Sequence, residues 1–287
     1  MAQIFNQAQL SYNSTVINSN VTVGELLPSL TVTKTAVGTT YTRGSEVTYI
    51  ISLVNRSDSP CSAVVITDDL GGYDIGTETV YPLAYVDGSV LLFTNGTLGT
   101  APAVNAEVPL SFSEITVPAN GNVMIIYQAE ITEFAPLGIG DEIVNTVTVD
   151  APCIGGSQPP VSDSETITAE EAPSIAITKH MEPTTVIDND IVTYTFVIEN
   201  YGNTALTEED GSVLTDTFTP PLSDITVTFN GEPWTESVNY TYAEASGAFA
   251  TLPGQITVPA ATFSQDPVTG VVTVIPGSVT LTVSGTI

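Results

Sequence analysis

Basic residues are nearly absent from this chain. Four Lys and Arg stand against 32 Asp and Glu, which gives a formal net charge of −28 over 287 residues. A nucleic-acid partner needs a cationic surface, so the composition argues against one. No apolar run approaches the roughly 20 residues that a membrane-spanning helix requires. We therefore expect neither a nucleic-acid partner nor a membrane span.

The residues of common catalytic and metal sites are also scarce. His180 is the single histidine, and strand alternation places it opposite a lysine, facing outward. No Gly-rich phosphate loop, zinc-ligand spacing or nucleophile–histidine–acid set occurs. The run at 188–190 (DND) lacks the ligand spacing of a calcium loop and fits a turn. We expect no metal, no cofactor and no turnover enzyme.

Cysteines are few, and no export signal is recognisable in the sequence. Cys61 and Cys153 are too few for a disulfide scaffold, and both a single disulfide and two free thiols remain open. No basic region followed by an apolar run marks a secretory leader, and no wall-sorting tail follows. We expect a longer precursor or an unusual export route, such as assembly on a spore.

What the sequence does contain is strand pattern. Hydrophobic residues make up 42% of the chain, with 22 Gly and 19 Pro between runs of alternating apolar and polar residues. Val, Ile and Thr, which favour strands, dominate these runs, and no helical period appears. The length suits two domains. The sequence predicts an all-β chain of two tandem immunoglobulin-like β-sandwiches.

Two copies of one pattern support this division, at separations of about 145 residues. The matched pairs are LTVTK 30–34 with IAITK 175–179, VTY 47–49 with 192–194, VITD 65–68 with VLTD 213–216, and ITVPA 115–119 with 256–260.

The closing strand of the repeat is displaced. Residues 142–149 (EIVNTVTV) close the first copy, whereas the second copy ends without such a strand. A similar segment, residues 3–10 (QIFNQAQL), stands at the N-terminus. A sandwich that lacks a strand has unpaired edges, which donation of a strand by a neighbour can repair. We expect head-to-tail joining, a heterologous contact that gives open filaments.

Three polar residue types recur on the core-facing side of the predicted strands. Alternation places Lys34, Asp68 and Asn145 among the apolar residues of the first copy. The corresponding set is Lys179, Asp216 and Asn6, and Asn6 shares its face with Ile4, Ala8 and Leu10.

Burial of these groups is costly unless they pair or react. It lowers the pKa of a lysine and raises that of an aspartate, which favours a neutral amine beside a protonated acid. Such an amine can attack an asparagine amide while the acid assists proton transfer. The product is an isopeptide bond, formed once in each molecule. The alternative is a snorkelling lysine at a strand end.

The motifs VTK, VTY, ITD, ITVPA and VNTVTV, which cover nearly the whole chain, resemble the conserved bacterial surface repeat known as domain of unknown function eleven. The resemblance implies an immunoglobulin-like sandwich on a bacterial exterior. Similar pilin and adhesin domains carry isopeptide bonds, so the resemblance implies that Lys34 joins Asn145 with assistance from Asp68. It likewise implies that Lys179 joins Asn6 of the next subunit with assistance from Asp216.

The expected organisation is a donor strand at 1–12, a linker at 13–28, a sandwich at 29–150, a linker at 151–173 and an incomplete sandwich at 174–287. The expected function is that of a structural subunit in an extracellular cell-surface or spore filament, a homopolymer of identical subunits.

Two alternatives remain. One is a monomeric adhesin that uses the loops at 71–110 or 229–250, with Trp234, Tyr240 and Tyr242 as a carbohydrate platform. The other is a monomer whose N-terminal strand completes its own second domain.

Overall fold

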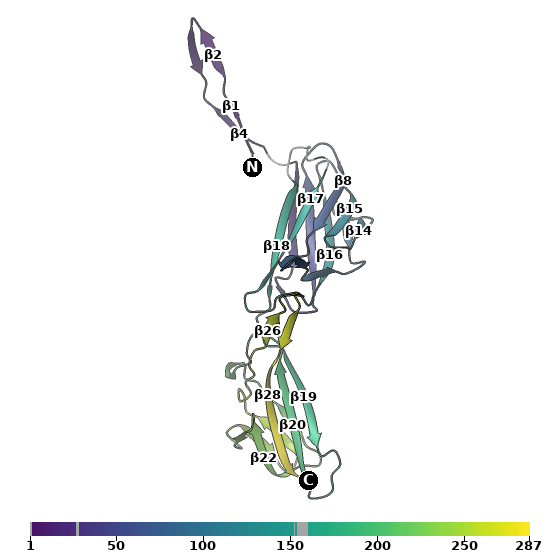
Figure 1. The fold of residues 1–287 in the computed structure, drawn as a ribbon, viewed down its shortest axis with the longest axis vertical. Helices are drawn as coiled ribbons and strands as arrows, with labels where there is room; N and C mark the ends of the chain where they lie inside the picture. The colour runs from purple at the N-terminus through teal and green to yellow at the C-terminus, as the bar shows by residue number, and fades with distance from the viewer. Residues whose placement is uncertain (1, 27–28, 152, 154–159) are drawn as a thin grey trace.

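The computed structural model describes residues 2–26, 29–151, 153 and 160–287. Figure 1 shows an elongated molecule in which a thin N-terminal hairpin, a first sandwich and a second sandwich follow one another. Nearly all of the regular structure is strand, and η2 (Glu208–Asp210) is a short 3-10 turn. The prediction of an all-β chain with two tandem immunoglobulin-like sandwiches is confirmed.

The N-terminal segment is a long β-hairpin. Its outer part pairs β2 (Gln9–Tyr12) with β3 (Thr15–Asn18), and its inner part pairs β1 (Ala2–Asn6) with β4 (Thr22–Leu26), both antiparallel. The expected linker at 13–28 is therefore wrong for its described part, because β3 and β4 form the return arm of the hairpin. Residues 27–28 lie outside the described part of the chain.

The first sandwich packs two sheets face to face. One sheet has the order β13-β12-β16-β7-β5, with β11 also paired to β16, and the other has the order β14-β15-β8-β17-β18-β6. A small hairpin joins β9 to β10. The strands are β5 (Leu30–Val37), β6 (Thr40–Tyr41), β7 (Glu46–Asn55), β8 (Cys61–Asp68), β9 (Tyr73–Ile75), β10 (Glu78–Val80), β11 (Leu83–Tyr85), β12 (Leu91–Thr94), β13 (Thr97–Leu98), β14 (Ala103–Asn105), β15 (Leu110–Val117), β16 (Gly121–Ile131), β17 (Glu142–Asp150) and β18 (Val161–Ala169).

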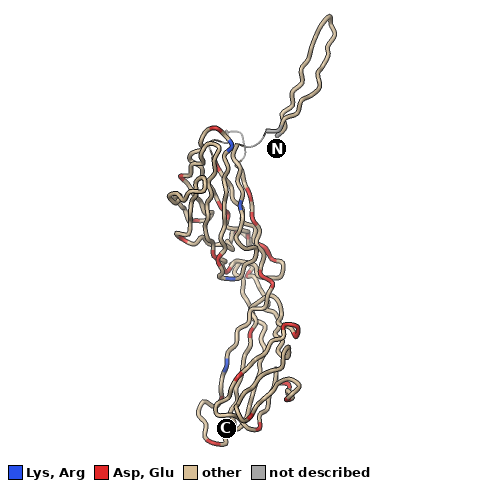
Figure 2. The backbone as a smooth tube through the Cα atoms, turned by 180° about the vertical axis from the view of Figure 1, so that it is seen from behind, with Lys and Arg blue, Asp and Glu red and all other residues tan. Residues whose placement is uncertain are grey.

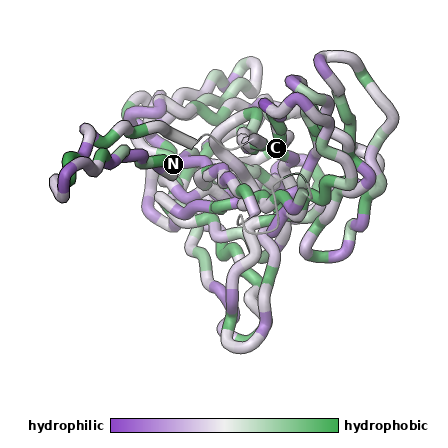
Figure 3. The backbone as a smooth tube through the Cα atoms, turned by 90° about the horizontal axis from the view of Figure 1, so that it is seen from above, coloured by the Kyte–Doolittle hydropathy of each residue, from purple (hydrophilic) through white to green (hydrophobic). Residues whose placement is uncertain are grey.

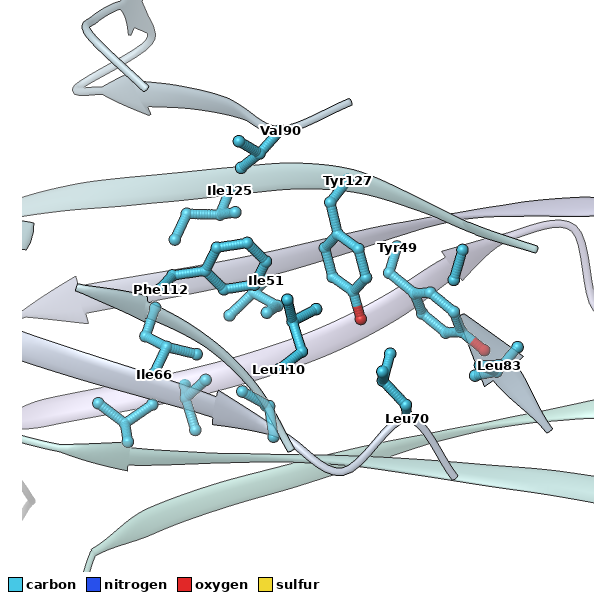
Figure 4. Packing of buried hydrophobic residues seen from close by; sticks show 14 of the residues in the cluster. Tyr49, Ile51, Ile66, Leu70, Leu83, Val90, Leu110, Phe112, Ile125 and Tyr127 are labelled. Atoms are coloured by element: carbon cyan, nitrogen blue, oxygen red, sulfur yellow. The ribbon is translucent and has the colours of Figure 1, made fainter. Parts of the chain in front are cut away.

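The core of this sandwich follows from strand alternation. Along β7, every second residue from Val47 to Leu53 is buried, as the pleat requires. Figure 4 shows Phe112 and Ile125 packed between the sheets, with the rings of Tyr49 and Tyr127 beside them. Tyr127 and Phe112 lie 5.4 Å apart between ring centroids. The two tyrosines place their hydroxyls inside this core, where Lys34, Asp68 and Asn145 are also buried.

The strand β18 corrects the first domain boundary. It pairs along its length with β17 and runs parallel to β6, so the first sandwich extends to Ala169 rather than to residue 150. The expected linker at 151–173 is wrong in this part. Residues 152 and 154–159 of that range lie outside the described residues.

The second sandwich has a five-stranded sheet that corresponds to the β5–β7–β16 sheet of the first sandwich, and it faces this sheet with a three-stranded one. The larger sheet has the order β19-β20-β28-β22-β23, and the smaller has the order β21-β25-β24. The strands are β19 (Ile175–Glu182), β20 (Ile191–Asn200), β21 (Thr215–Thr217), β22 (Ser223–Phe229), β23 (Glu232–Trp234), β24 (Tyr240–Ala243), β25 (Ala248–Thr251), β26 (Thr262–Gln265), β27 (Val272–Ile275) and β28 (Gly277–Thr286).

The hairpin β26–β27 ties the sandwiches together. The Val272 amide donates to the Glu133 carbonyl at 2.9 Å, and the Arg43 guanidinium donates to the Val272 carbonyl at 2.5 Å. Phe263 and Val274 pack against the core of the first sandwich. The two sandwiches therefore share apolar and hydrogen-bonded contacts.

Cys61 and Cys153 form a disulfide, with Cα atoms 5.3 Å apart and a sequence separation of 92. The bond ties the start of β8 to the segment that follows β17. It answers the question that the sequence left open between a disulfide and two free thiols.

Replacing both cysteines, as Cys61→Ser with Cys153→Ser, is expected to lower the unfolding free energy of the first sandwich by about 2–4 kcal/mol, because the bond restrains a long loop of the unfolded chain. Denaturant titration with a fluorescence readout measures the change. The transition of the second sandwich serves as the internal control. An unchanged first transition would contradict the prediction.

Candidate functional site

A lysine and an aspartate meet inside the first sandwich. Lys34 extends inward from β5, and its Nζ lies 2.6 Å from Oδ2 of Asp68 at the end of β8. Neither side chain has any exposed surface. The structure thus confirms the expected inward orientation of both residues, and Lys34 does not snorkel to solvent.

Asn145 joins this pair through a tyrosine. The Tyr127 hydroxyl donates to Asp68 Oδ2 at 2.5 Å, and Asn145 Nδ2 donates to that hydroxyl oxygen at 3.3 Å. Asn145 is fully buried, and its Oδ1 has no hydrogen-bond partner. A buried carbonyl oxygen without a donor is costly, so this amide is held in a place where its carbonyl is unsatisfied.

Burial sets the electrostatics of the cluster. Desolvation lowers the pKa of Lys34, while the attraction of Asp68 opposes the shift. Desolvation also raises the pKa of Tyr127, with the neighbouring Asp68 adding to the rise, so Tyr127 stays a hydrogen-bond donor. The Lys34 Nζ lies 4.9 Å from the centroid of the Tyr49 ring.

The sequence analysis missed Tyr127 and Tyr49. Both lie on the buried faces of alternating strands, opposite one another in the register of β16 and β7, and their rings stack at 5.6 Å. Figure 4 shows both hydroxyls pointing to the same side of the core. The available signal was the alternation itself, because a tyrosine on a core face needs a partner for its hydroxyl.

The second sandwich holds the same pair in a different environment. Lys179 Nζ contacts Asp216 Oδ2, but the side chains are 39% and 19% exposed. The amine lies over aromatic rings, 4.6 Å from the centroid of Tyr194 and 5.4 Å from that of Phe218. Tyr194 and Tyr49 are counterparts, but Val283 faces Tyr194 where Tyr127 faces Tyr49.

The exposure arises because one side of this sandwich is open. In the first sandwich, β8 pairs with both β15 and β17. Among the described residues, its counterpart β21 pairs with β25 alone. Along β19, Ile175 and Ile177 are 43% and 54% exposed, whereas their counterparts Leu30 and Val32 are 1% and 9% exposed. An apolar strand face is left uncovered beside Lys179.

Asn6 does not lie near Lys179 of its own chain. It belongs to β1 in the N-terminal hairpin, and Figure 1 shows this hairpin beyond the first sandwich, away from the second. The residues that share its face, Ile4, Ala8 and Leu10, are all exposed, and Figure 3 shows apolar and polar stretches alternating along the hairpin. The structure therefore differs from a monomer that completes its own second sandwich.

The remaining candidates are dispersed. Trp234 stacks on Phe229 at 4.9 Å, Tyr240 is buried, and the Tyr242 hydroxyl bonds to the backbone of Leu222, so these aromatics form no joint platform. His180 is exposed, and the run 188–190 lies in a turn.

Figure 2 shows a few basic residues and more numerous acidic ones scattered along the chain. In the described ranges no group of three or more His, Cys, Asp or Glu could hold a metal ion. Nor does that part of the chain contain a helix long and apolar enough to cross a membrane.

The two lysine–aspartate pairs should differ in energy. Asp68→Ala is expected to destabilise the first sandwich by about 3–5 kcal/mol, because it leaves a buried amine without its partner. The matched change Asp216→Ala is expected to cost less than about 1 kcal/mol, because that pair is partly exposed. Denaturant unfolding of both variants measures the two losses of unfolding free energy. Equal losses would contradict the expected difference between the buried and the partly exposed pair.

No protein-family model matches the chain, so the resemblance to the conserved bacterial surface repeat stays a prediction. No curated protein matches its sequence.

Solved structures with a similar fold include a pilus backbone protein of Streptococcus pneumoniae, at 14% identity and a TM-score of 0.34, which matches 86% of this chain and 55% of that one. The major pilin SpaD of Corynebacterium diphtheriae is similar at 12% identity and a TM-score of 0.37, with 86% of this chain and 59% of that one covered. A fragment of the major pilin GBS80 of Streptococcus agalactiae is similar at 12% identity and a TM-score of 0.35, with 87% of this chain and 91% of that one covered. The chain thus spans little more than half of the first two structures. At these values the similarity concerns the β-sandwich fold alone.

Proposed function

We propose that this chain is a structural subunit of an extracellular bacterial filament, in which the N-terminal strand of one copy completes the second sandwich of the next. One observation carries the proposal. Among the described residues, no strand of the second sandwich occupies the position that β17 fills in the first, and the exposed N-terminal strand β1 resembles β17 in sequence.

The register supports this match residue by residue. In the first sandwich, Val147 of β17 lies opposite Asp68. The same alignment places Ala8 of an incoming strand opposite Asp216. The four residues of β17 that face the core, Ile143, Asn145, Val147 and Val149, are at most 2% exposed, and their counterparts are Ile4, Asn6, Ala8 and Leu10. The donated face would therefore be buried.

Within the first sandwich, we propose an isopeptide bond between Lys34 and Asn145, which are linked through Asp68 and Tyr127. In its neutral form, which burial favours, the Lys34 amine would attack the Asn145 side-chain carbonyl carbon, and the Asp68 carboxyl would relay a proton from the amine to the departing nitrogen. A C–N bond forms, a C–N bond breaks and one ammonia leaves. The Tyr127 hydroxyl, bonded to both Asp68 and Asn145, positions the two groups.

At the junction, the same reaction would join Lys179 to Asn6 of the next subunit. The open face leaves Lys179 exposed in the single chain. Insertion of the donor strand would bury it in the apolar surroundings that an attacking amine requires. The bond would then form only after docking, which keeps the free subunit unreacted.

The assembly would be an open homopolymer, because the donating and accepting surfaces lie in different parts of one chain. Its strong negative charge would limit lateral association of filaments at low salt. The proposal needs no cofactor, metal or enzymatic turnover, and it places the protein at a cell or spore surface.

The junction can be tested by electrophoresis of assembled protein after boiling in detergent and reductant. We expect a ladder whose tryptic peptides join Lys179 to Asn6, lighter by one ammonia, and we expect Asn6→Ala or Lys179→Met to abolish it. The matched variant Asn145→Ala should keep the ladder and lose the internal crosslink. A single unmodified band for the unaltered protein would refute the covalent junction.

Tyr127→Phe provides a separate test of the internal bond. Removing the hydroxyl takes away the contact that joins Asp68 and Asn145, so bond formation should slow by up to about 100-fold, as expected when a reacting group loses its positioning. The loss of one ammonia, followed by intact mass against time, measures the rate. The control is Tyr73→Phe, whose hydroxyl bonds the Phe134 carbonyl outside the cluster. Equal rates in both variants would remove Tyr127 from the account.

A further inference from the structure

We propose that the donated element is the whole N-terminal hairpin of a second copy, residues 2–26, and that its return arm β3–β4 seals a second edge of the acceptor. This inference rests on the proposed function, and it extends the donor beyond a single strand.

The first sandwich shows what the return arm does. Its β18 pairs with β17 and also reaches the opposite sheet, where the Lys34 amide donates to Asp163 Oδ2 at 2.7 Å. At its end β18 runs parallel to β6, with Thr168 opposite Thr40. The β17–β18 hairpin therefore closes the β8 edge through one arm and covers the β5 edge through the other.

The inner part of the N-terminal hairpin, β1 with β4, has the register of β17 with β18, whereas the outer part, β2 with β3, is shifted by one residue. Asn6 lies opposite Thr22, as Asn145 lies opposite Glu165. Ile4 lies opposite Gly24, as Ile143 lies opposite Ile167. The order along the chain is also the same, because β18 precedes the strand with Lys179 and β4 precedes the strand with Lys34. Each hairpin therefore stands directly before a lysine strand.

The second sandwich leaves both acceptor edges free. Among the described residues, β19 pairs with β20 alone, as β21 pairs with β25 alone. The counterpart of Thr40 is Thr185, which lies in an exposed segment without strand pairing. Nearby, Ile187 and Ile191 are 74% and 66% exposed. A single donated strand would pair β21 and leave the edge of β19 open to further chains.

The alignment gives a specific contact. Glu25 lies opposite Gln3 in the hairpin, as Thr168 lies opposite Glu142 in the first sandwich. Since Thr168 pairs with Thr40, Glu25 of the donor should run beside Thr185 of the acceptor. This backbone pairing distinguishes donation of the hairpin from donation of one strand.

Hydrogen–deuterium exchange of the full chain, compared between the monomeric fraction and assembled filaments, tests the inference. We expect exchange to slow at least about tenfold in 15–26 and in 175–187, together with 2–10 and 215–217. Slowing confined to 2–10 and 215–217 would overturn the inference and leave strand donation standing. No assembly, and no slowing anywhere, would overturn both.

A cysteine pair provides the second measurement, in a Lys179→Met background that removes the isopeptide ladder. Glu25→Cys with Thr185→Cys should give a ladder that reductant dissolves. Ser14→Cys with Thr185→Cys is the matched control, because Ser14 lies in the turn at the hairpin tip, and it should give no ladder. Equal crosslinking in both variants, or none in the first when exchange shows docked 2–10, would overturn the inference.

Discussion

The pairing of β8 with β17 is the constraint on which the rest of the structure depends. Where that strand is present, in the first sandwich, Leu30 and Val32 are buried and Lys34 has no exposed surface. Where no described strand occupies that position, in the second, Ile175, Ile177 and Lys179 are exposed. In the described part of the second sandwich, the counterparts of both β17 and β18 are missing, and this changes the solvation of a whole sheet face, because the edges and faces of a sandwich must be covered.

The same constraint governs chemistry. A lysine beside an aspartate is an ordinary ion pair in water, but burial lowers the pKa of Lys34 and brings its amine closer to the neutral form. The Tyr127 hydroxyl links the acid to the amide, and the amide carbonyl has no donor. In the second sandwich, the Lys179–Asp216 pair is partly exposed, and Val283 stands where Tyr127 stands in the first. The pair therefore lacks both the burial and the hydroxyl of the first site. Docking would supply the burial but not the hydroxyl, so we expect the junction to react more slowly than the internal site.

The hairpins give the chain a modular arrangement. Each sandwich needs a two-stranded element that stands before the following sandwich in the sequence, so the β17–β18 hairpin completes the first sandwich and leads into the second. By the same rule the N-terminal hairpin leads into the first sandwich and belongs, in our proposal, to the second sandwich of another copy.

The sequence alone determined the all-β class and the inward faces of Lys34, Asp68 and Asn145, because strand alternation fixes which residues share a face. It did not reveal the return arms, since β3, β4 and β18 carry many polar residues and resembled linkers. Only the tertiary structure decided that Cys61 and Cys153 meet, that Tyr127 joins the buried cluster and that Lys179 is exposed. These depend on contacts between segments distant in the chain, which local pattern does not encode.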